Sequence, residues 1–183
     1  MTTATPTAPP LPPSEPDDAT EAAREHEPGL LRYARHLTGR DAVAREVVQD
    51  TLTRLLEQPV DKRGELTGGR LKAWLYTVCR NRCFDLRRKD RRMKPLALAP
   101  ARIADPGTDP ANGPDARAER RETHAGVLRE VARLPGDQQE ALRLKFQGGL
   151  SYAEIGDVME TTVPRVGYLI HRGLKALRER LAD

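Results

Sequence analysis

The chain has 183 residues, of which 32% are charged, 38% are hydrophobic and 4% are aromatic. This composition excludes one large apolar core and fits one domain or two small helical ones. The net charge of +4 and the pI near 9.3 suit a polyanionic partner. No apolar run approaches the ~20 residues of a membrane span, and the N-terminus lacks the apolar core of a signal peptide.

The cysteines, Cys79 and Cys83, stand four residues apart on one predicted helix. Adjacent turns of a helix are poor disulfide geometry, which indicates a reducing cytoplasm. A zinc site needs further ligands nearby, and no histidine is close in sequence. We therefore expect structural thiols, with no metal and no other cofactor.

The first part of the chain predicts a tail followed by a small helical bundle. Residues 1–20 are rich in Pro, Thr and acids, which is typical of a disordered leader. A domain follows at 21–95. Its first helix runs from Glu21 to near Gly39, and Asp41 is a candidate cap for a second helix that ends at Pro59. Residues 61–69 are expected to form a loop.

The stretch 71–95 reads LKAWLYTVCRNRCFDLRRKDRRMKP. Helical spacing places Leu71, Leu75 and Val78 on one side, with Trp74 beside them as a core residue. After Leu86 the stretch carries a dense row of cations, which is the footprint of a nucleic-acid site. A solvated cationic face without a partner is the alternative.

Residues 96–118 are rich in Ala, Pro, Gly and Asp, so we expect a flexible linker. A second helical domain follows at 119–183. Asp137 with Glu140, and Ser151 with Glu154, have the spacing of capping boxes. The last helix is expected to bury one face, made of these residues: Val163, Val166, Ile170, Leu174, Leu177 and Leu181.

A short capped helix, a tight turn and a longer helix are the pattern of a helix-turn-helix, whose second helix enters the DNA major groove. The exposed side of that helix offers Arg165, Tyr168, His171, Arg172 and Lys175. An ordinary three-helix bundle with a solvated last helix is the alternative. The fold class expected for the whole chain is all-α, with two small domains and no β-alternation.

Together these stretches resemble bacterial RNA polymerase sigma factors of the compact extracytoplasmic-function (ECF) type. The segment AREVVQDTLTRLL resembles their core-polymerase-binding helix, and LKAWLYTVCRNRCFDLRRKDRR resembles their promoter-melting segment, both in region two. The segments LPGDQQEALRLKFQGGLSYAEIGDVM and HRGLKALRERL resemble region four. The resemblance covers nearly everything from about Pro28 to Leu181 except the linker.

The resemblance implies a function and a set of sites. Such a protein binds core polymerase, reads and melts the −10 element of promoter DNA, and reads the −35 element. The implied polymerase-binding residues are Glu46, Val47, Gln49 and Asp50. The implied −10 residues are Asn81, Arg82, Asp85, Arg87, Arg88, Lys89, Arg91 and Arg92. The implied −35 residues are Arg165, Tyr168, His171 and Arg172. An anti-sigma factor is a further implied partner.

Some positions depart from the family pattern. Arg45 stands where an acid is usual, and Pro164 replaces a small residue. Gly167, Leu169 and Leu174 occupy places where the family often has cations, which predicts fewer phosphate contacts.

Two other function classes fit the sequence less well. A stand-alone helix-turn-helix regulator explains only the second domain. A nucleic-acid enzyme would need metal ligands, but Asp41, Glu46 and Asp50 lack metal-site spacing. We expect no catalytic activity and no small-molecule substrate.

Overall fold

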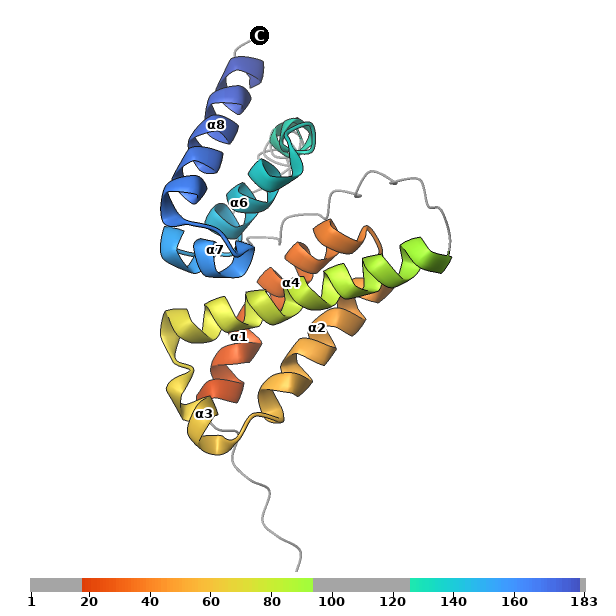
Figure 1. Cartoon of the computed structure of the whole chain (residues 1–183), viewed down its shortest axis with the longest axis vertical. Helices are drawn as coiled ribbons and strands as arrows, with labels where there is room; N and C mark the ends of the chain where they lie inside the picture. Colours follow the sequence, from red (N-terminus) through yellow and green to blue (C-terminus); the bar gives the residue numbers. More distant parts are fainter. Residues whose placement is uncertain (1–17, 94–125, 182–183) are drawn as a thin grey trace, which may run out of the picture.

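The computed structural model describes residues 18–93 and 126–181, and within these ranges the chain forms helices and no strand. We call residues 18–93 module one and residues 126–181 module two (Figure 1). The expected all-α fold is confirmed for the described part of the chain. The predicted linker, 96–118, and most of the predicted tail, 1–20, lie outside the described residues. None of the described helices is long and apolar enough to cross a membrane.

Module one is a helical bundle in which α1 (Asp18–Thr38), α2 (Asp41–Leu56) and α4 (Gly68–Met93) pack on one another. Leu30, Val47, Leu71 and Leu75 have at most 1% of their surface exposed and form its centre. Thr51 is also fully buried, and its hydroxyl donates to the carbonyl of Val47 at 2.8 Å. Leu71 and Leu75 of the stripe predicted in α4 therefore lie in this core, whereas Val78 is only half-buried.

Two details of module one correct the sequence prediction. A short helix, α3 (Val60–Glu65), lies where a loop was expected, and it buries no residue. Because it has no apolar face, hydrophobic periodicity could not reveal it. Asp41 is not a cap: it is the first residue of α2, and the residue before it, Arg40, makes no side-chain capping bond. The carboxylate of Asp41 pairs with Arg35 instead.

Module two contains a helical turn at residues 126–131, then α6 (Gly136–Phe146), α7 (Tyr152–Met159) and α8 (Val163–Leu181). Leu144, Ile155, Val158 and Val166 are fully buried where α6, α7 and α8 meet. The core of module two is small, so its stability depends strongly on local features such as helix caps.

The buried face of α8 differs from the predicted one. Val163, Leu174 and Leu181 are 47%, 38% and 53% exposed, whereas Leu169 and Gly173 are buried. A Cβ at position 173 would lie 2.9 Å from a methyl group of Leu142. The absence of a side chain at Gly173 thus lets α6 approach α8 closely, which turns the helix so that its inner stripe includes position 173.

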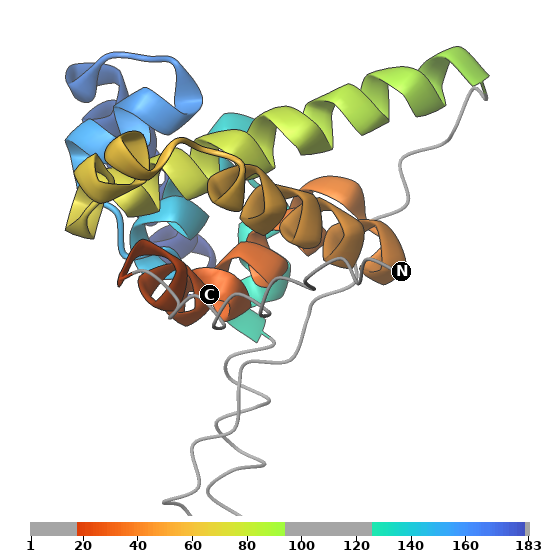
Figure 2. The same ribbon diagram turned by 90° about the horizontal axis from the view of Figure 1, so that it is seen from below.

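The two modules pack against each other in one body with a continuous hydrophobic core. Helix α7 lies beside α4 (Figure 1), and Lys72 donates to the carbonyl of Gly149 at 3.2 Å. Gly69 faces the carboxylate of Glu154 so closely that a Cβ there would collide with it. Far from this contact, the C-terminal end of α4 extends past the other helices (Figure 2). The cationic half of α4 is therefore presented away from the bundle.

His36 lies on α1 of module one, close to Arg143 of module two. Burial, together with the charges of Arg143 on α6 and Arg87 on α4, lowers the pKa of His36 from its ordinary 6.5 to about 3. Its Nδ1 atom is buried without a hydrogen-bond partner among the described residues. The imidazole is therefore neutral in the folded protein under conditions where the unfolded chain is protonated.

This difference predicts an acid-side loss of stability. As pH falls from 6.5 towards 3, the unfolded chain binds a proton at His36 that the folded chain does not, so the free energy of unfolding falls by up to about 1.4 kcal/mol per pH unit. In urea titrations at several pH values, His36→Gln should reduce this slope. The control His171→Gln, on an exposed side chain of α8, should keep it. Equal slopes for wild type and His36→Gln would contradict the prediction.

Candidate nucleic-acid interface

The C-terminal half of α4 presents polar and cationic side chains to solvent. The predicted −10 residues with exposed side chains are Asn81, Asp85, Arg88 and Lys89. Arg88 donates to the carboxylate of Asp85 one turn earlier. Because an exposed ion pair contributes only about 0–1 kcal/mol, Arg88 can exchange this carboxylate for a phosphate at little cost. Arg91 and Arg92 lie within α4, but their side chains are outside the described set.

Arg82 lies on the side of α4 that faces α2. Its Nε atom is 2.8 Å from Oδ2 of Asp50, and its Nη2 atom is 3.9 Å from Oε1 of Glu46. The structure thus brings a predicted −10 residue into contact with two predicted polymerase-binding residues. The side chain of Arg82 is 29% exposed, so only part of it is accessible to a ligand.

The predicted polymerase-binding residues lie on the outer side of α2, with one exception. Glu46 and Gln49 are exposed, and the side chain of Asp50 is 39% exposed. Val47 has no exposed surface and packs in the core, which corrects its placement on the docking face. Val47 holds α2 in position and cannot touch a partner directly.

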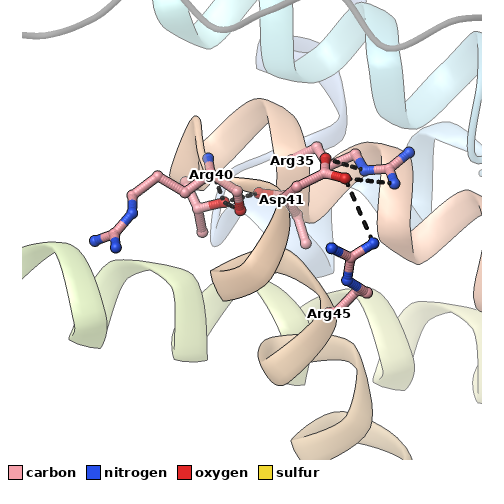
Figure 3. A network of polar contacts seen from close by, with 6 residues as sticks. Arg35, Arg40, Asp41 and Arg45 are labelled. Carbon is pink, nitrogen blue, oxygen red and sulfur yellow. Dashed lines mark hydrogen bonds and ion pairs between the residues drawn. The ribbon is translucent and has the colours of Figure 1, made fainter.

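Arg45, the departure from the family pattern, is paired within its own helix. The carboxylate of Asp41 binds Arg35 through both of its oxygens, at 2.7 and 3.0 Å, and Arg45 approaches the same group at 3.6 Å (Figure 3). The positive charge of Arg45 is thus directed towards the start of α2. The carboxylates of Glu46 and Asp50, further along α2, form the acidic part of the surface.

Helices α7 and α8 form the predicted helix-turn-helix. The hydroxyl of Ser151 accepts from the backbone N–H of Glu154, and the Glu154 carboxylate accepts from the N–H of Ser151 at 2.6 Å, so the predicted capping box is confirmed. The turn begins at Glu160, whose φ of 54° is left-handed. A Cβ at Gly156 would lie 2.9 Å from the carbonyl of Thr161, so the tight turn requires glycine there.

The predicted −35 residues Arg165, Tyr168, His171 and Arg172 are all exposed on α8. The guanidinium of Arg165 lies 5.4 Å from the ring centre of Tyr168 and pairs with Asp137 of α6 at 3.2 Å. The structure therefore gathers these residues on one accessible side of the second helix of the motif. Leu169, which we compared with family cations, is instead buried on the opposite side.

The predicted box at the start of α6 is wrong. Asp137 accepts from the N–H of Gln138 at 2.9 Å, but Glu140 makes no capping bond. The Glu140 carboxylate accepts from Tyr33 and Arg80 of module one instead. Neither this contact nor the exposed ring of Phe84, which Arg80 and Arg87 flank, was predicted from the sequence. An exposed aromatic within a cationic helix was the available signal for Phe84.

Each of the two modules matches a known family model. Residues 22–93 match the family model described as Sigma-70 region 2, and residues 124–177 match the model described as Sigma-70, region 4. The two matches together cover most of the described residues, so the chain belongs to the class of RNA polymerase sigma factors.

Curated relatives narrow the class. The ECF RNA polymerase sigma factor SigL of Mycobacterium tuberculosis is 30% identical over 164 residues, which cover 87% of this chain and 86% of SigL. SigE of Mycolicibacterium smegmatis is 28% identical over 88% of this chain and 61% of its own length. The chain belongs to the ECF RNA polymerase sigma factors. As a member it binds core RNA polymerase and directs promoter recognition and transcription initiation.

Solved structures share the fold. The sigma factor RpoE of Bartonella quintana, crystallised with the anti-sigma factor NepR, has a TM-score of 0.64 at 22% identity and covers 90% of this chain and 97% of its own. CnrH, solved with the cytosolic domain of CnrY, has a TM-score of 0.54 at 21% identity, over 90% and 87% of the respective chains.

The capping box gives a direct test of how the helix-turn-helix is held together. Ser151→Ala removes the acceptor for the N–H of Glu154, so the free energy of unfolding should fall by about 1 kcal/mol. Urea denaturation followed by circular dichroism measures this change. Thr53→Ala, at an exposed position of α2, serves as the control and should change stability much less. An unchanged midpoint for Ser151→Ala would show that the box is dispensable.

Proposed function

We propose that this sigma factor acts in the cytoplasm as a promoter-specificity subunit without a catalytic step of its own, and that its surfaces divide the work as follows. The acidic side of α2 docks on core polymerase through Glu46, Gln49 and Asp50. The cationic half of α4 holds the −10 region, and α8 reads the −35 element. The observation that carries the assignment is the presence of one exposed cationic helix face on each module.

On α4, the proposal assigns different tasks to neighbouring residues. Asn81 and Asp85 offer hydrogen-bonding groups to unpaired bases, and the arginines and Lys89 offer charge to phosphates. Arg87 and Arg88 are consecutive residues in the cationic half of α4, and Arg88 is exposed. A strand that follows this part of α4 therefore meets cations in succession.

On α8, Arg165, Tyr168, His171 and Arg172 are proposed to contact the major groove. An arginine that binds guanine through two hydrogen bonds discriminates between bases, whereas one that binds phosphate contributes sequence-independent affinity. The packing of Arg165 on the Tyr168 ring orders both side chains before DNA arrives.

An anti-sigma factor is proposed as a further partner. The Bartonella quintana relative of similar fold was solved in complex with such a protein. The stand-alone regulator alternative is not favoured, because it leaves the region-two module without a role.

Reconstituted transcription tests the proposal. Core polymerase with the wild-type protein should produce promoter-specific transcripts that core polymerase alone does not. A Glu46→Ala, Asp50→Ala double variant should bind core polymerase at least about tenfold more weakly, because it removes charged contacts that are each worth roughly 1 kcal/mol or more. Glu57→Ala, at the exposed C-cap of α2, is the matched control and should bind normally.

Either of two results would contradict this assignment. One is the absence of specific transcripts at every promoter selected with the holoenzyme. The other is equal polymerase affinity for the double variant and the Glu57→Ala control, which would remove α2 from the docking surface.

The salt dependence of promoter binding tests α8. Arg172→Ala should lower the magnitude of the slope of log K against log salt concentration by about 0.9 if Arg172 binds one phosphate. Holoenzyme binding to duplex promoter DNA at several salt concentrations gives this slope. Lys62→Ala, on the exposed surface of α3, should leave it unchanged. An unchanged slope and affinity for Arg172→Ala would place the DNA elsewhere.

A further inference from the structure

The junction between the modules holds a buried carboxylate. Glu140 of α6 is 7% exposed, and its Oε1 atom accepts hydrogen bonds from the Tyr33 hydroxyl at 2.6 Å and from the Arg80 Nε at 2.8 Å. Both donors belong to module one. A carboxylate withdrawn from water requires such partners, because leaving it unpaired is costly. The hydrogen-bond partners of Glu140 thus lie in module one and not in its own helix.

The packing around this contact is close. Gly29 of α1 lies against the Tyr76 hydroxyl, and a Cβ there would be 2.6 Å from it. A Cβ at Gly148 of module two would lie 3.2 Å from the same Tyr76 ring, which also packs on Tyr33 at 5.3 Å between ring centres. The approach of Gly148 to Tyr76 shows that the modules are closely packed at this point, whereas the Gly29 contact lies within module one.

The cation that Glu140 binds, Arg80, adjoins the surface proposed for the −10 strand. Arg80 precedes Asn81 on α4, and its guanidinium lies 4.7 Å from the centre of the Phe84 ring. Arg87 approaches the same ring at 5.9 Å, and the ring is 38% exposed. Guanidinium groups around an accessible aromatic ring are the composition of single-strand binding platforms, where phosphates meet the cations and a base stacks on the ring.

The observed arrangement cannot place both DNA-binding surfaces on one promoter. Asp137, one helical turn before Glu140, pairs with Arg165 of α8 at 3.2 Å. The path from Arg80 to Arg165 runs through the ion pair with Glu140, one turn of α6 and the ion pair of Asp137. The two arginines therefore lie on the order of 25 Å apart. Elements centred at −35 and −10 lie about 25 base pairs apart, which is roughly 85 Å along B-DNA.

Simultaneous contact with both elements thus requires the modules to separate. The residues that connect them, at ~3.3 Å each when extended, are numerous enough to permit this. Separation withdraws Glu140 from Arg80 and leaves the Arg80–Phe84–Arg87 cluster open.

We propose that Glu140 is an internal competitor of DNA: in the free protein its carboxylate occupies Arg80 in place of a phosphate, and on opening the Arg80–Phe84–Arg87 cluster binds the single strand. Arg80 is then a DNA-contacting residue in its own right, and its exchange between carboxylate and phosphate couples module separation to strand capture. This inference rests on the proposed function of α4.

Opposite effects of two substitutions test the competition. Glu140→Ala and Arg80→Ala both break the contact, so each should lengthen the distance between fluorophores attached at Thr53→Cys and Arg178→Cys, which are exposed on α2 and α8. The affinity for a fluorescent single-stranded oligonucleotide, measured at one fixed salt concentration, should differ between the two variants. Glu140→Ala should bind about tenfold more tightly than wild type, as expected if about one tenth of the wild-type protein is open. Arg80→Ala should bind more weakly than Glu140→Ala.

Tyr33→Phe provides a second route, because it removes one donor to Glu140 and leaves both Arg80 and the carboxylate in place. It should also open the protein and raise oligonucleotide affinity. Glu130→Ala is the matched control: this carboxylate pairs with Arg133 one turn later in module two, so distance and affinity should stay at the wild-type values.

Three results would overturn the proposal. The first is wild-type distance and affinity in both Glu140→Ala and Tyr33→Phe. The second is opening without a gain in oligonucleotide affinity. The third is equal affinity for Glu140→Ala with and without Arg80→Ala. None of these measurements uses polymerase, so a failure of promoter-directed transcription alone would refute the proposed function and leave this inference standing.

Discussion

The structure depends on a single continuous helix, α4, that is buried along its first half and cationic along its second. At 1.5 Å per residue, its 26 residues extend about 39 Å. Leu71 and Leu75 anchor it between α1 and α2, and its C-terminal end extends past the other helices (Figure 2). Because a helix transmits orientation along its length, the packing of its N-terminal half determines where its charges are presented to nucleic acid.

The contact between the modules is held by a buried ion pair with an added tyrosine hydroxyl. Desolvation of such a pair nearly cancels its electrostatic gain, so its net contribution to stability is small. The pair does require a defined geometry, however, because a different packing of the two modules would leave Glu140 or Tyr33 buried without a hydrogen-bond partner. The pair therefore selects one arrangement of the modules without making that arrangement hard to leave, and separation returns both charges to water.

Much of the fold could be predicted from local pattern. The all-α class, the core stripe of α4, the Ser151 box and the exposed side of α8 followed from helical periodicity and capping chemistry. The predictions that failed were those that depend on contacts between residues distant in sequence or on an element without a buried face. Glu140 has the spacing of a capping residue, yet its carboxylate binds Tyr33 and Arg80, which are distant in sequence, and not the backbone at the start of α6. The buried face of α8 shifted because Gly173 admits Leu142, and α3 escaped notice because it buries nothing. Among the predicted site residues whose side chains the structure describes, Val47 lies in the core and not on the docking face.

The close approach of Gly69 to Glu154 links two positions that are far apart in the chain. The Glu154 carboxylate cannot simply turn aside, because it closes the cap of α7 by accepting from Ser151. A side chain at position 69 would thus either unfasten that cap or push the modules apart. Among descendants of this gene, substitutions at positions 69 and 154 are therefore expected to arise together.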